Sequence, residues 1–366
     1  MIILRNLDEA EDLLVGASIL ATGGGGSPSL GLKLVKDVLD KGVFIKIVDL
    51  EEIEWNNGVL VSPYFIGSMG SLSESREARI KDMLLKAIEV IEKAIGRKVV
   101  GFVSSELGGS NTAVPLYASA LVGIPVVDGD LMGRAGPELH QSTAHIFNVR
   151  VTPSVVISPS GTIVLFEDIA NVDDYESIAG HIARISGGWS LVIDTPLTRS
   201  DAEKVIIRNT LSLSMKLGRS LREARGKGFN ALNVILNTLN GWVIFDGVVS
   251  KVDLRNTGRF LEGYVELKGD KGRLRIYVKN EYLMAWLNET PIVMCPDLII
   301  LLDEEGRPIL SNMVKEGIRG IVVASRAPSV WRSERGLELF GPRHFGFDYE
   351  YKPVEELIGG GYAGGL

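Results

Sequence analysis

Residues 99–130, VVGFVSSELGGSNTAVPLYASALVGIPVVDGD, decide the fold. The run 99–104 is short, apolar and rich in branched residues, as buried strands are, and the run 124–127 has the same character. Residues 111–122, which lie between these runs, predict a helix. A helix between two buried strands indicates a three-layer α/β domain with a parallel sheet. In such a sheet ligands usually bind at the carboxyl ends of the strands.

The same alternation extends toward the N-terminus. Asn6 and Glu9 form a capping box for a helix that continues to Ala21, and Pro28 begins a second helix. The apolar runs 43–48 and 58–65 predict two further buried strands. A long amphipathic helix follows, with apolar side chains at Ile80, Met83, Leu84, Ala87, Ile88, Ile91, Ala94 and Ile95.

The pattern changes at Gly241. Before it, a turn at 158–161 between two apolar runs reads as a hairpin, and helical stretches are expected at 174–185 and 200–218. After it, short strands separated by turn residues are typical of a small antiparallel barrel. These strands are expected at 242–254, 260–267, 274–278, 283–286, 292–294, 298–302 and 321–324.

These patterns predict the fold class α/β with two domains, as a chain of 366 residues leads one to expect. The N-terminal domain, 1–165, is expected to be a three-layer α/β sandwich that carries a glycine-rich loop and an acidic cluster. The C-terminal domain, 166–366, is expected to contain a small antiparallel β-barrel, at roughly 241–325.

Composition narrows the class of protein. The net charge of −7 without a basic stripe argues against nucleic acid, and no apolar run approaches the ~20 residues that span a bilayer. The single cysteine, Cys295, and the lack of signal-peptide features at the N-terminus predict a cytoplasmic protein. The single glutamine, Gln141, adds a weak indication of a thermophile. A homodimer is the default expectation for assembly.

A glycine-rich loop, TGGGGSP at 22–28, separates the first two helices. It places free backbone amides at a helix N-terminus, where an anion or oxyanion is stabilised. It is no dinucleotide fingerprint, because it follows a helix, and it lacks the Gly-Lys-Ser/Thr of a phosphate loop. The alternative is a flexible turn between helices. The candidate substrate-binding residues are Gly23, Gly24, Gly25, Gly26 and Ser27.

Polar residues follow the strand at 99–104. Glu106 comes just past its end, with two glycines clearing space beside it, and is a candidate general acid or base. Asn111 is a candidate substrate ligand, although it also suits the N-cap of the next helix. The alternative places Glu106 on an exposed loop.

The densest cluster is DGDLMGRAGPE at 128–138. Asp128 and Asp130 are candidate catalytic carboxylates, and Arg134 and Glu138 are candidate substrate ligands, since an arginine can hold a carboxylate with two hydrogen bonds. A purely structural salt-bridge network is the alternative. His140 and His145 lie just downstream.

A divalent metal is the less favoured cofactor hypothesis for this region, because the two histidines lack a recognised ligand spacing such as His-Glu-x-x-His. The metal ligands, if any, stay unknown.

Seven segments are specific in combination: LATGGGGSP (20–28), ELGGSN (106–111), PVVDGD (125–130), MGR (132–134), PEL (137–139), CPDLI (295–299) and residues 331–345. With these segments the chain resembles, nearly end to end, the S-methyl thiohydantoin desulfurase family. That family was formerly a domain of unknown function, often found near or fused to hydantoinase or oxoprolinase proteins. The resemblance implies an N-terminal three-layer α/β domain and a C-terminal β-barrel domain.

The resemblance also implies an activity. It is the hydrolytic removal of a thiol from the carbon between two ring nitrogens of a thiohydantoin, or related chemistry on hydantoins. Such chemistry needs an activated water, donors for the developing negative charge and a proton for the leaving sulfur. Among the residues at hand, Glu106 or Asp130 would be the base, the glycine amides the anion donors and Arg134 the substrate clamp.

Two functions therefore remain open. The first is a hydrolase that acts on a small cyclic amide or thioamide. The second is a non-catalytic ligand-binding or accessory subunit of a hydantoinase- or oxoprolinase-like partner, since fold and family do not by themselves establish chemistry. Acidic residues beside glycine-rich loops favour the hydrolase.

Overall fold

The structure, a computed structural model, describes residues 1–67, 74–227 and 230–359. The chain forms two compact units, each built around its own β-sheet. The first unit contains residues 1–17, 25–133 and 138–215, and the second contains residues 18–24, 134–137 and 216–366. Within the described ranges, no helix combines the length and apolar character needed to cross a membrane.

A mixed nine-stranded sheet is the framework of the first unit. Its strands are β1 (Ile2–Leu4), β2 (Ile45–Val48), β3 (Val59–Gly67), β4 (Val99–Ser104), β5 (Val126–Asp130), β6 (Ser154–Ile157), β7 (Ile163–Phe166), β8 (Trp189–Leu197) and β9 (Ile207–Arg208). The order is β1-β2-β5-β4-β3-β8-β6-β7, and β9 pairs with β5. The central strands β2, β5, β4 and β3 are parallel, and the outer strands join them antiparallel. The carboxyl ends of β4 and β5 are therefore neighbours.

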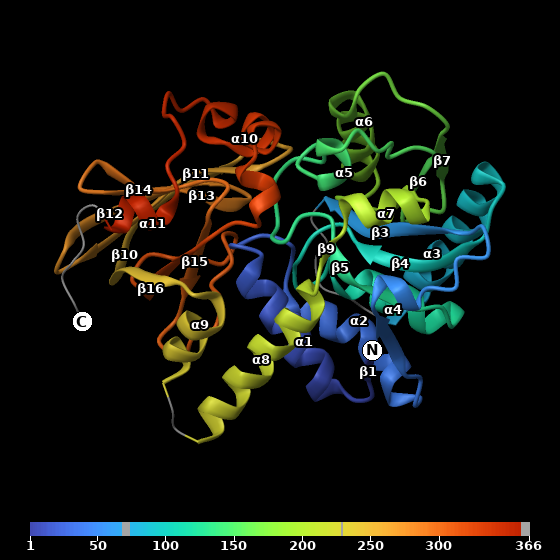
Figure 1. The fold of residues 1–366 in the computed structure, drawn as a ribbon, viewed down its shortest axis with the longest axis horizontal. Helices are drawn as coiled ribbons and strands as arrows, with labels where there is room; N and C mark the ends of the chain where they lie inside the picture. Colours follow the sequence, from blue (N-terminus) through green and yellow to red (C-terminus); the bar gives the residue numbers. More distant parts are fainter. Residues whose placement is uncertain (68–73, 228–229, 360–366) are drawn as a thin grey trace. The chain divides into compact units, whose positions relative to one another are not determined.

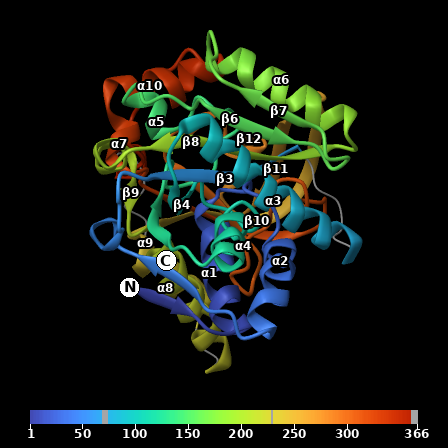
Figure 2. The same cartoon turned by 90° about the vertical axis from the view of Figure 1, so that its right-hand side faces the viewer.

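Helices cover both faces of this sheet. They are α2 (Pro28–Asp40), α3 (Glu74–Ile95), α4 (Ala113–Val122), α5 (Thr143–Ile146), α6 (Val172–Ile185) and α7 (Arg199–Val205), with the 3₁₀ turn η1 (Leu50–Glu52). Helix α4 contacts β3 and β4, and α6 contacts β3 and β8 from the opposite side, above the strands in Figure 1. Helices α2 and α3 lie beside α4 (Figure 2). Tyr64 of β3 packs with Tyr175 and Ala179 of α6, as the alternation of side chains along a strand requires.

Two helices continue from one unit into the other along the chain. They are α1 (Leu7–Leu20) and α8 (Thr210–Gly226). The predicted capping box at the start of α1 is confirmed in part, because the Glu9 amide donates to Asn6 Oδ1 at 3.0 Å.

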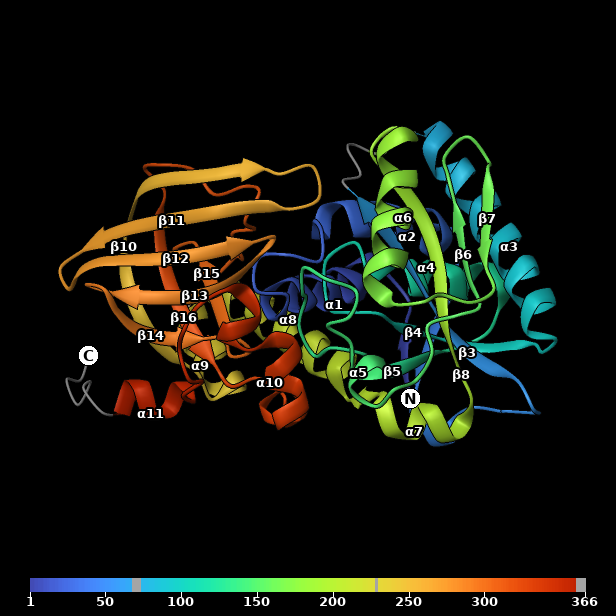
Figure 3. The same cartoon turned by 90° about the horizontal axis from the view of Figure 1, so that it is seen from above.

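The second unit is built on a seven-stranded antiparallel sheet, whose strands alternate in direction (Figure 3). Its strands are β10 (Trp242–Asn256), β11 (Leu261–Gly269), β12 (Gly272–Lys279), β13 (Glu281–Leu287), β14 (Thr290–Met294), β15 (Leu298–Leu302) and β16 (Arg319–Ser325). The order is β14-β13-β12-β11-β10-β16-β15. No ladder joins β14 to β15 in the described part of the chain, so the closure of the predicted barrel stays a prediction.

The apolar side chains of this sheet form a separate core that includes Phe245, Leu267, Ile276, Ile299 and Val322. The remaining elements of the unit are α9 (Ala231–Leu239), η2 (Ser329–Arg332), α10 (Glu334–Phe340), η3 (Pro342–Phe345) and α11 (Val354–Gly359). Val354 of α11 packs into the core of the sheet.

The mixed α/β class is confirmed, and two local predictions differ from the structure. Strand β5 continues through Asp128 and Asp130, which were expected after the strand, because Gly129 and Asp130 pair with β9. The helix expected at 200–218 is divided into α7 and α8, with β9 between them. Both differences arise from one pairing between segments about eighty residues apart, which local periodicity does not reveal.

Candidate active site

Asp130 is the last residue of β5, and its side chain is completely buried. Its Oδ2 accepts hydrogen bonds from the backbone amides of Gly133 (2.6 Å) and Met132 (2.9 Å), in the turn that follows the strand. Its Oδ1 accepts none of normal geometry within the described residues. One oxygen of this buried carboxyl is therefore fixed, and the other keeps its capacity to bind a proton or a ligand.

Burial raises the pKa of Asp130 from 3.8 to about 7. The main cause is the loss of solvation of the charged form. The nearby Glu106 adds to the rise, while the two turn amides and the Thr210 hydroxyl lower the pKa. A carboxyl with this pKa gains and loses a proton near neutral pH, as a general acid or base must.

Glu106 lies just beyond β4 and is half-buried. The Asn111 side-chain amide donates to Glu106 Oε1 at 2.7 Å. The Asn111 backbone amide donates to the carbonyl oxygen of Gly25 at 3.2 Å. The structure thus brings together four predicted site residues, Asp130, Glu106, Asn111 and Gly25, within the first unit.

The second half of the glycine loop packs against the segment after Glu106. The amides of Gly109 and Ser110 donate to the carbonyl oxygens of Gly26 and Gly25, each at 3.2 Å. A Cβ on Gly26 would lie 1.8 Å from Ser110 Oγ, and Gly26 has φ +78, a backbone conformation that favours glycine. Within the described chain, the amides of Gly25 and Gly26 donate to no protein acceptor. Their predicted contact with an anionic group stays a prediction.

Ser27 is the N-cap of α2, and its side chain makes no capping hydrogen bond. Its Oγ lies 2.8 Å from Ser29 Oγ, at the partly exposed start of the helix. The position suits the predicted ligand contact, which stays a prediction.

Asp128 caps a helix. Its Oδ1 accepts the backbone amides of Leu211 (3.1 Å) and Ser212 (2.9 Å) in the first turn of α8, and its carbonyl oxygen accepts the Asn209 amide at 2.9 Å. A carboxylate at a helix N-terminus satisfies amides that have no partner in the helix. The structure therefore gives Asp128 a stabilising role, and its predicted catalytic role stays a prediction.

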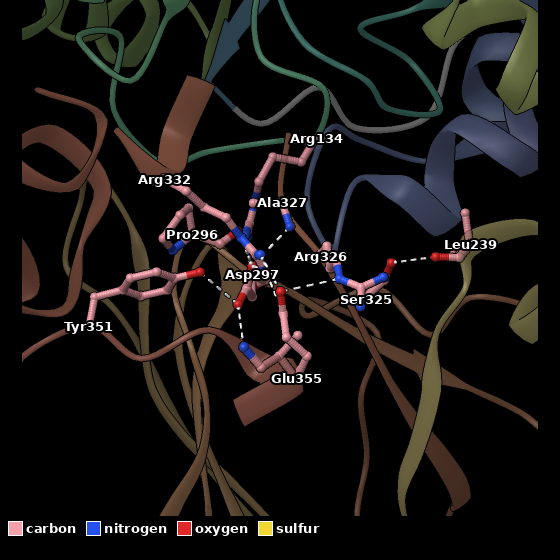
Figure 4. Close-up of polar contacts among 11 residues, drawn as sticks. Arg134, Leu239, Pro296, Asp297, Ser325, Arg326, Ala327, Arg332, Tyr351 and Glu355 are labelled. Carbon is pink, nitrogen blue, oxygen red and sulfur yellow. Dashed lines mark hydrogen bonds and ion pairs between the residues drawn. The ribbon is translucent and has the colours of Figure 1, made fainter. Parts of the chain in front are cut away.

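Arg134 belongs to the second unit and is completely buried. Its Nη1 donates to the carbonyl oxygens of Pro296 (2.6 Å) and Asp297 (3.2 Å) (Figure 4). Its Nη2 donates to Thr22 Oγ1 (2.7 Å) and to the carbonyl oxygen of Tyr282 (3.3 Å). The guanidinium thus binds protein oxygens and connects separate segments of the second unit, and the predicted contact with substrate stays a prediction.

The first half of the glycine loop also lies in the second unit, against the start of β13. A Cβ on Gly23 would lie 2.6 Å from the Tyr282 ring, and one on Gly24 would lie 1.7 Å from Glu281 Oε1. Glu281 is 3% exposed. Sequence reasoning missed this carboxyl, although an acid at the head of the apolar run YLMAWL was a visible signal.

Glu138 lies in the first unit and forms a local polar cluster. Its Oε2 accepts the Gln141 side-chain amide at 3.0 Å and lies 3.3 Å from His140 Nε2. The other ring nitrogen, His140 Nδ1, lies 3.0 Å from Asp173 Oδ1. His140 is thereby placed between two carboxylates, and the rings of His140 and His145 are 6.2 Å apart. The predicted ligand contact of Glu138 and the metal hypothesis stay predictions.

Two hydroxyls beside Asp130 were not predicted. Ser104 is the ladder partner of Asp130 in β4, and Thr210 is the first residue of α8. Both side chains are buried. Serine and threonine are common residues, so nothing in the sequence marks these two positions. Only the pairing of strands places them near the Asp130 carboxyl.

Comparison with known families covers almost the whole chain. The S-Me-THD-like N-terminal domain matches residues 8–168, and the S-Me-THD-like C-terminal domain matches residues 170–354. The chain belongs to the S-Me-THD-like family. The resemblance inferred from the glycine loop and the acidic segments is thereby confirmed.

The fold of this S-Me-THD-like chain is similar to that of a solved protein. An X-ray crystal structure of a protein from Chromobacterium violaceum matches with a TM-score of 0.80 and 23% sequence identity, over 97% of this chain and 100% of that chain. At this identity the likeness establishes the fold alone. A comparison with curated proteins found no match.

Proposed function

We propose that this S-Me-THD-like protein hydrolyses a five-membered cyclic amide or thioamide of the hydantoin or thiohydantoin type. The observation that carries the proposal is Asp130, a buried carboxyl with a pKa of about 7 and one oxygen that accepts no hydrogen bond of normal geometry among the described residues. It stands where ligands of parallel α/β sheets bind. The family and the neighbouring Glu106 support the same reaction class.

For an S-methyl thiohydantoin the reaction has a simple proton balance. Ionised Asp130 takes a proton from water as the oxygen bonds to the carbon between the two ring nitrogens, and the electrons of the carbon–nitrogen double bond move to nitrogen. The carbon–sulfur bond then breaks, and sulfur leaves with the bonding pair. Sulfur takes the proton from Asp130, which is ionised again. The hydroxyl proton moves to the ring nitrogen as the carbonyl forms, so the products are a hydantoin and methanethiol.

The other site residues have supporting roles in this proposal. Glu106 is half-buried and accepts a hydrogen bond from Asn111. Its negative charge raises the pKa of Asp130. The amides of Gly25 and Gly26 stabilise the negative charge that develops on the ring. Arg134 positions segments of the second unit through carbonyl oxygens.

The test is turnover of a panel of hydantoins, thiohydantoins and S-methyl thiohydantoins by the purified chain, with released thiol and ring absorbance followed. We expect turnover to rise with pH around 7, as Asp130 ionises, and to fall by about 100-fold or more in Asp130→Asn. In Glu106→Gln the rise should move to lower pH, because the negative charge that raises the pKa of Asp130 is removed. Asp194→Asn is the matched control. It removes another buried carboxyl, whose pKa burial raises to about 6, from a different strand.

Ligand binding without any turnover by the isolated chain would contradict the hydrolase. Copurification with a larger hydantoinase-like subunit would then favour the accessory-subunit hypothesis.

A further inference from the structure

Three buried polar atoms, at the ends of β4 and β5 and at the start of α8, make no hydrogen bond of normal geometry within the described residues. They are Ser104 Oγ, Asp130 Oδ1 and Thr210 Oγ1. Ser104 and Asp130 are 0% exposed, and Thr210 is 6% exposed. Buried polar atoms without a partner are costly, so they usually mark the place of a water or a ligand.

The backbone brings these three residues to one place. Ser104 and Asp130 are partners in the parallel ladder of β4 and β5, so their side chains point to the same face of the sheet. Asp130 also pairs with Ile207 of β9, three residues before Thr210. Asp128, two residues earlier on the same face, binds the first amides of α8, the helix that Thr210 begins.

Asp194, a second buried carboxyl in the same sheet, has protein hydrogen-bond donors at both of its oxygens. Asp194 Oδ2 accepts the hydroxyls of Tyr64 (2.7 Å) and Tyr175 (3.2 Å), and Asp194 Oδ1 accepts the Thr195 hydroxyl at 2.9 Å. Both of its oxygens are therefore bonded to protein. Asp130 differs, because Oδ2 accepts two backbone amides while Oδ1, like the Ser104 and Thr210 hydroxyls, makes no hydrogen bond of normal geometry among the described residues.

We infer that Ser104, Thr210 and Asp130 Oδ1 together hold the water molecule that attacks the ring carbon, an inference that rests on the proposed hydrolysis. The water donates one hydrogen to Asp130 Oδ1 and the other to one hydroxyl, and it accepts a hydrogen from the second hydroxyl. Three polar partners are typical for a buried water. One lone pair of the water remains free to attack, and the proton it loses goes to Oδ1.

The test combines kinetics with a readout that needs no turnover. We expect Ser104→Ala and Thr210→Val each to lower kcat by about 10- to 100-fold with little change in KM, because the substrate still binds while the nucleophile is misplaced. The same variants should raise the pKa of Asp130, measured by carboxyl NMR or infrared titration of the full chain without substrate. Thr210→Ser keeps the hydroxyl and should restore both quantities.

Ser62→Ala is the matched control, because Ser62 Oγ is also buried without a hydrogen-bond partner in the described chain but belongs to β3. The inference is overturned if Ser104→Ala and Thr210→Val change kcat and the pKa of Asp130 no more than Ser62→Ala does. It is also overturned if a high-resolution crystal structure shows no water between the three atoms. If no substrate is turned over while the water and the pKa changes are found, the site stands and the proposed reaction fails.

Discussion

Asp128 and Asp130 are two residues apart in one strand, and their side chains point to the same face, yet their environments differ. Asp128 meets the amides at the start of α8, where a negative charge is stabilised. Asp130 is completely buried, with two amides at one oxygen and none at the other. The sequence presents both as equivalent catalytic candidates, and the tertiary contacts separate a helix cap from a titrating group.

The raised pKa of Asp130 makes folding stability depend on pH. The carboxyl is harder to ionise in the fold than in the unfolded chain, so its favourable contribution is complete below about pH 4 and is lost as pH rises through about 7. We expect Asp130→Asn to raise the free energy of unfolding at pH 8 by up to about 4 kcal/mol, from about 1.4 kcal/mol per pKa unit, and by little at pH 4. Urea unfolding at both pH values measures this, and equal differences at the two would contradict the raised pKa.

At the scale of elements, the glycine loop is a candidate ligand-binding segment that also packs closely against the backbone after Glu106. Gly25 has φ +65, and a Cβ there would lie 2.5 Å from the Gly108 Cα and the Leu107 carbonyl oxygen. These are backbone atoms that cannot move aside. The loop therefore needs glycine both for its backbone conformation and for its contact with the segment that follows Glu106.

Gly25→Ala and Gly42→Ala separate these two requirements. Gly42 has φ +75, and an added Cβ would have no atom within 4 Å, so alanine there costs only the unfavourable backbone conformation, about 1–2 kcal/mol. We expect Gly25→Ala to lose about 1–3 kcal/mol more, because the added methyl group overpacks the contact. Thermal or urea unfolding of the two variants measures the difference. Equal losses would show that the contact relaxes freely.

At the scale of the whole molecule, buried charges hold together segments that are distant in sequence. In the second unit, Asp297 is fully buried and its Oδ1 accepts two hydrogen bonds from Arg332, at 3.0 and 2.6 Å (Figure 4). Its Oδ2 accepts the Tyr351 hydroxyl (2.9 Å) and the Val354 amide (2.8 Å). This carboxylate therefore anchors the segment that leads into α11. Arg332 also pairs with the more exposed Glu355.

Removing the two partners of Arg332 should have unequal effects. Asp297→Asn leaves Arg332 without its buried counter-charge and should cost about 3–5 kcal/mol of unfolding free energy. Glu355→Gln removes a carboxylate whose side chain is 31% exposed, and should cost about 1 kcal/mol or less. Urea unfolding compares them, with limited proteolysis of the C-terminal segment as a second readout. Equal losses would contradict the anchoring role of Asp297.

The sequence by itself determined the α/β class, the positions of most helices and strands, and the family. Periodicity, capping residues and short motifs are local properties, and they are visible along the chain. They also predict a catalytic site at the strand ends near Glu106 and Asp130, and this stays a prediction. The boundary near residue 165 stays a prediction, while the compact units interleave along the chain.

Only the tertiary structure decided which polar residues meet. The pairing of β5 with β9 extends the strand through Asp130 and places Thr210 beside it. The pKa of Asp130 depends on its complete burial, and the environment of Arg134 depends on carbonyl oxygens about 150 residues away. Burial and long-range strand pairing depend on contacts between segments that are distant in sequence, so they cannot be predicted from a local pattern of residues.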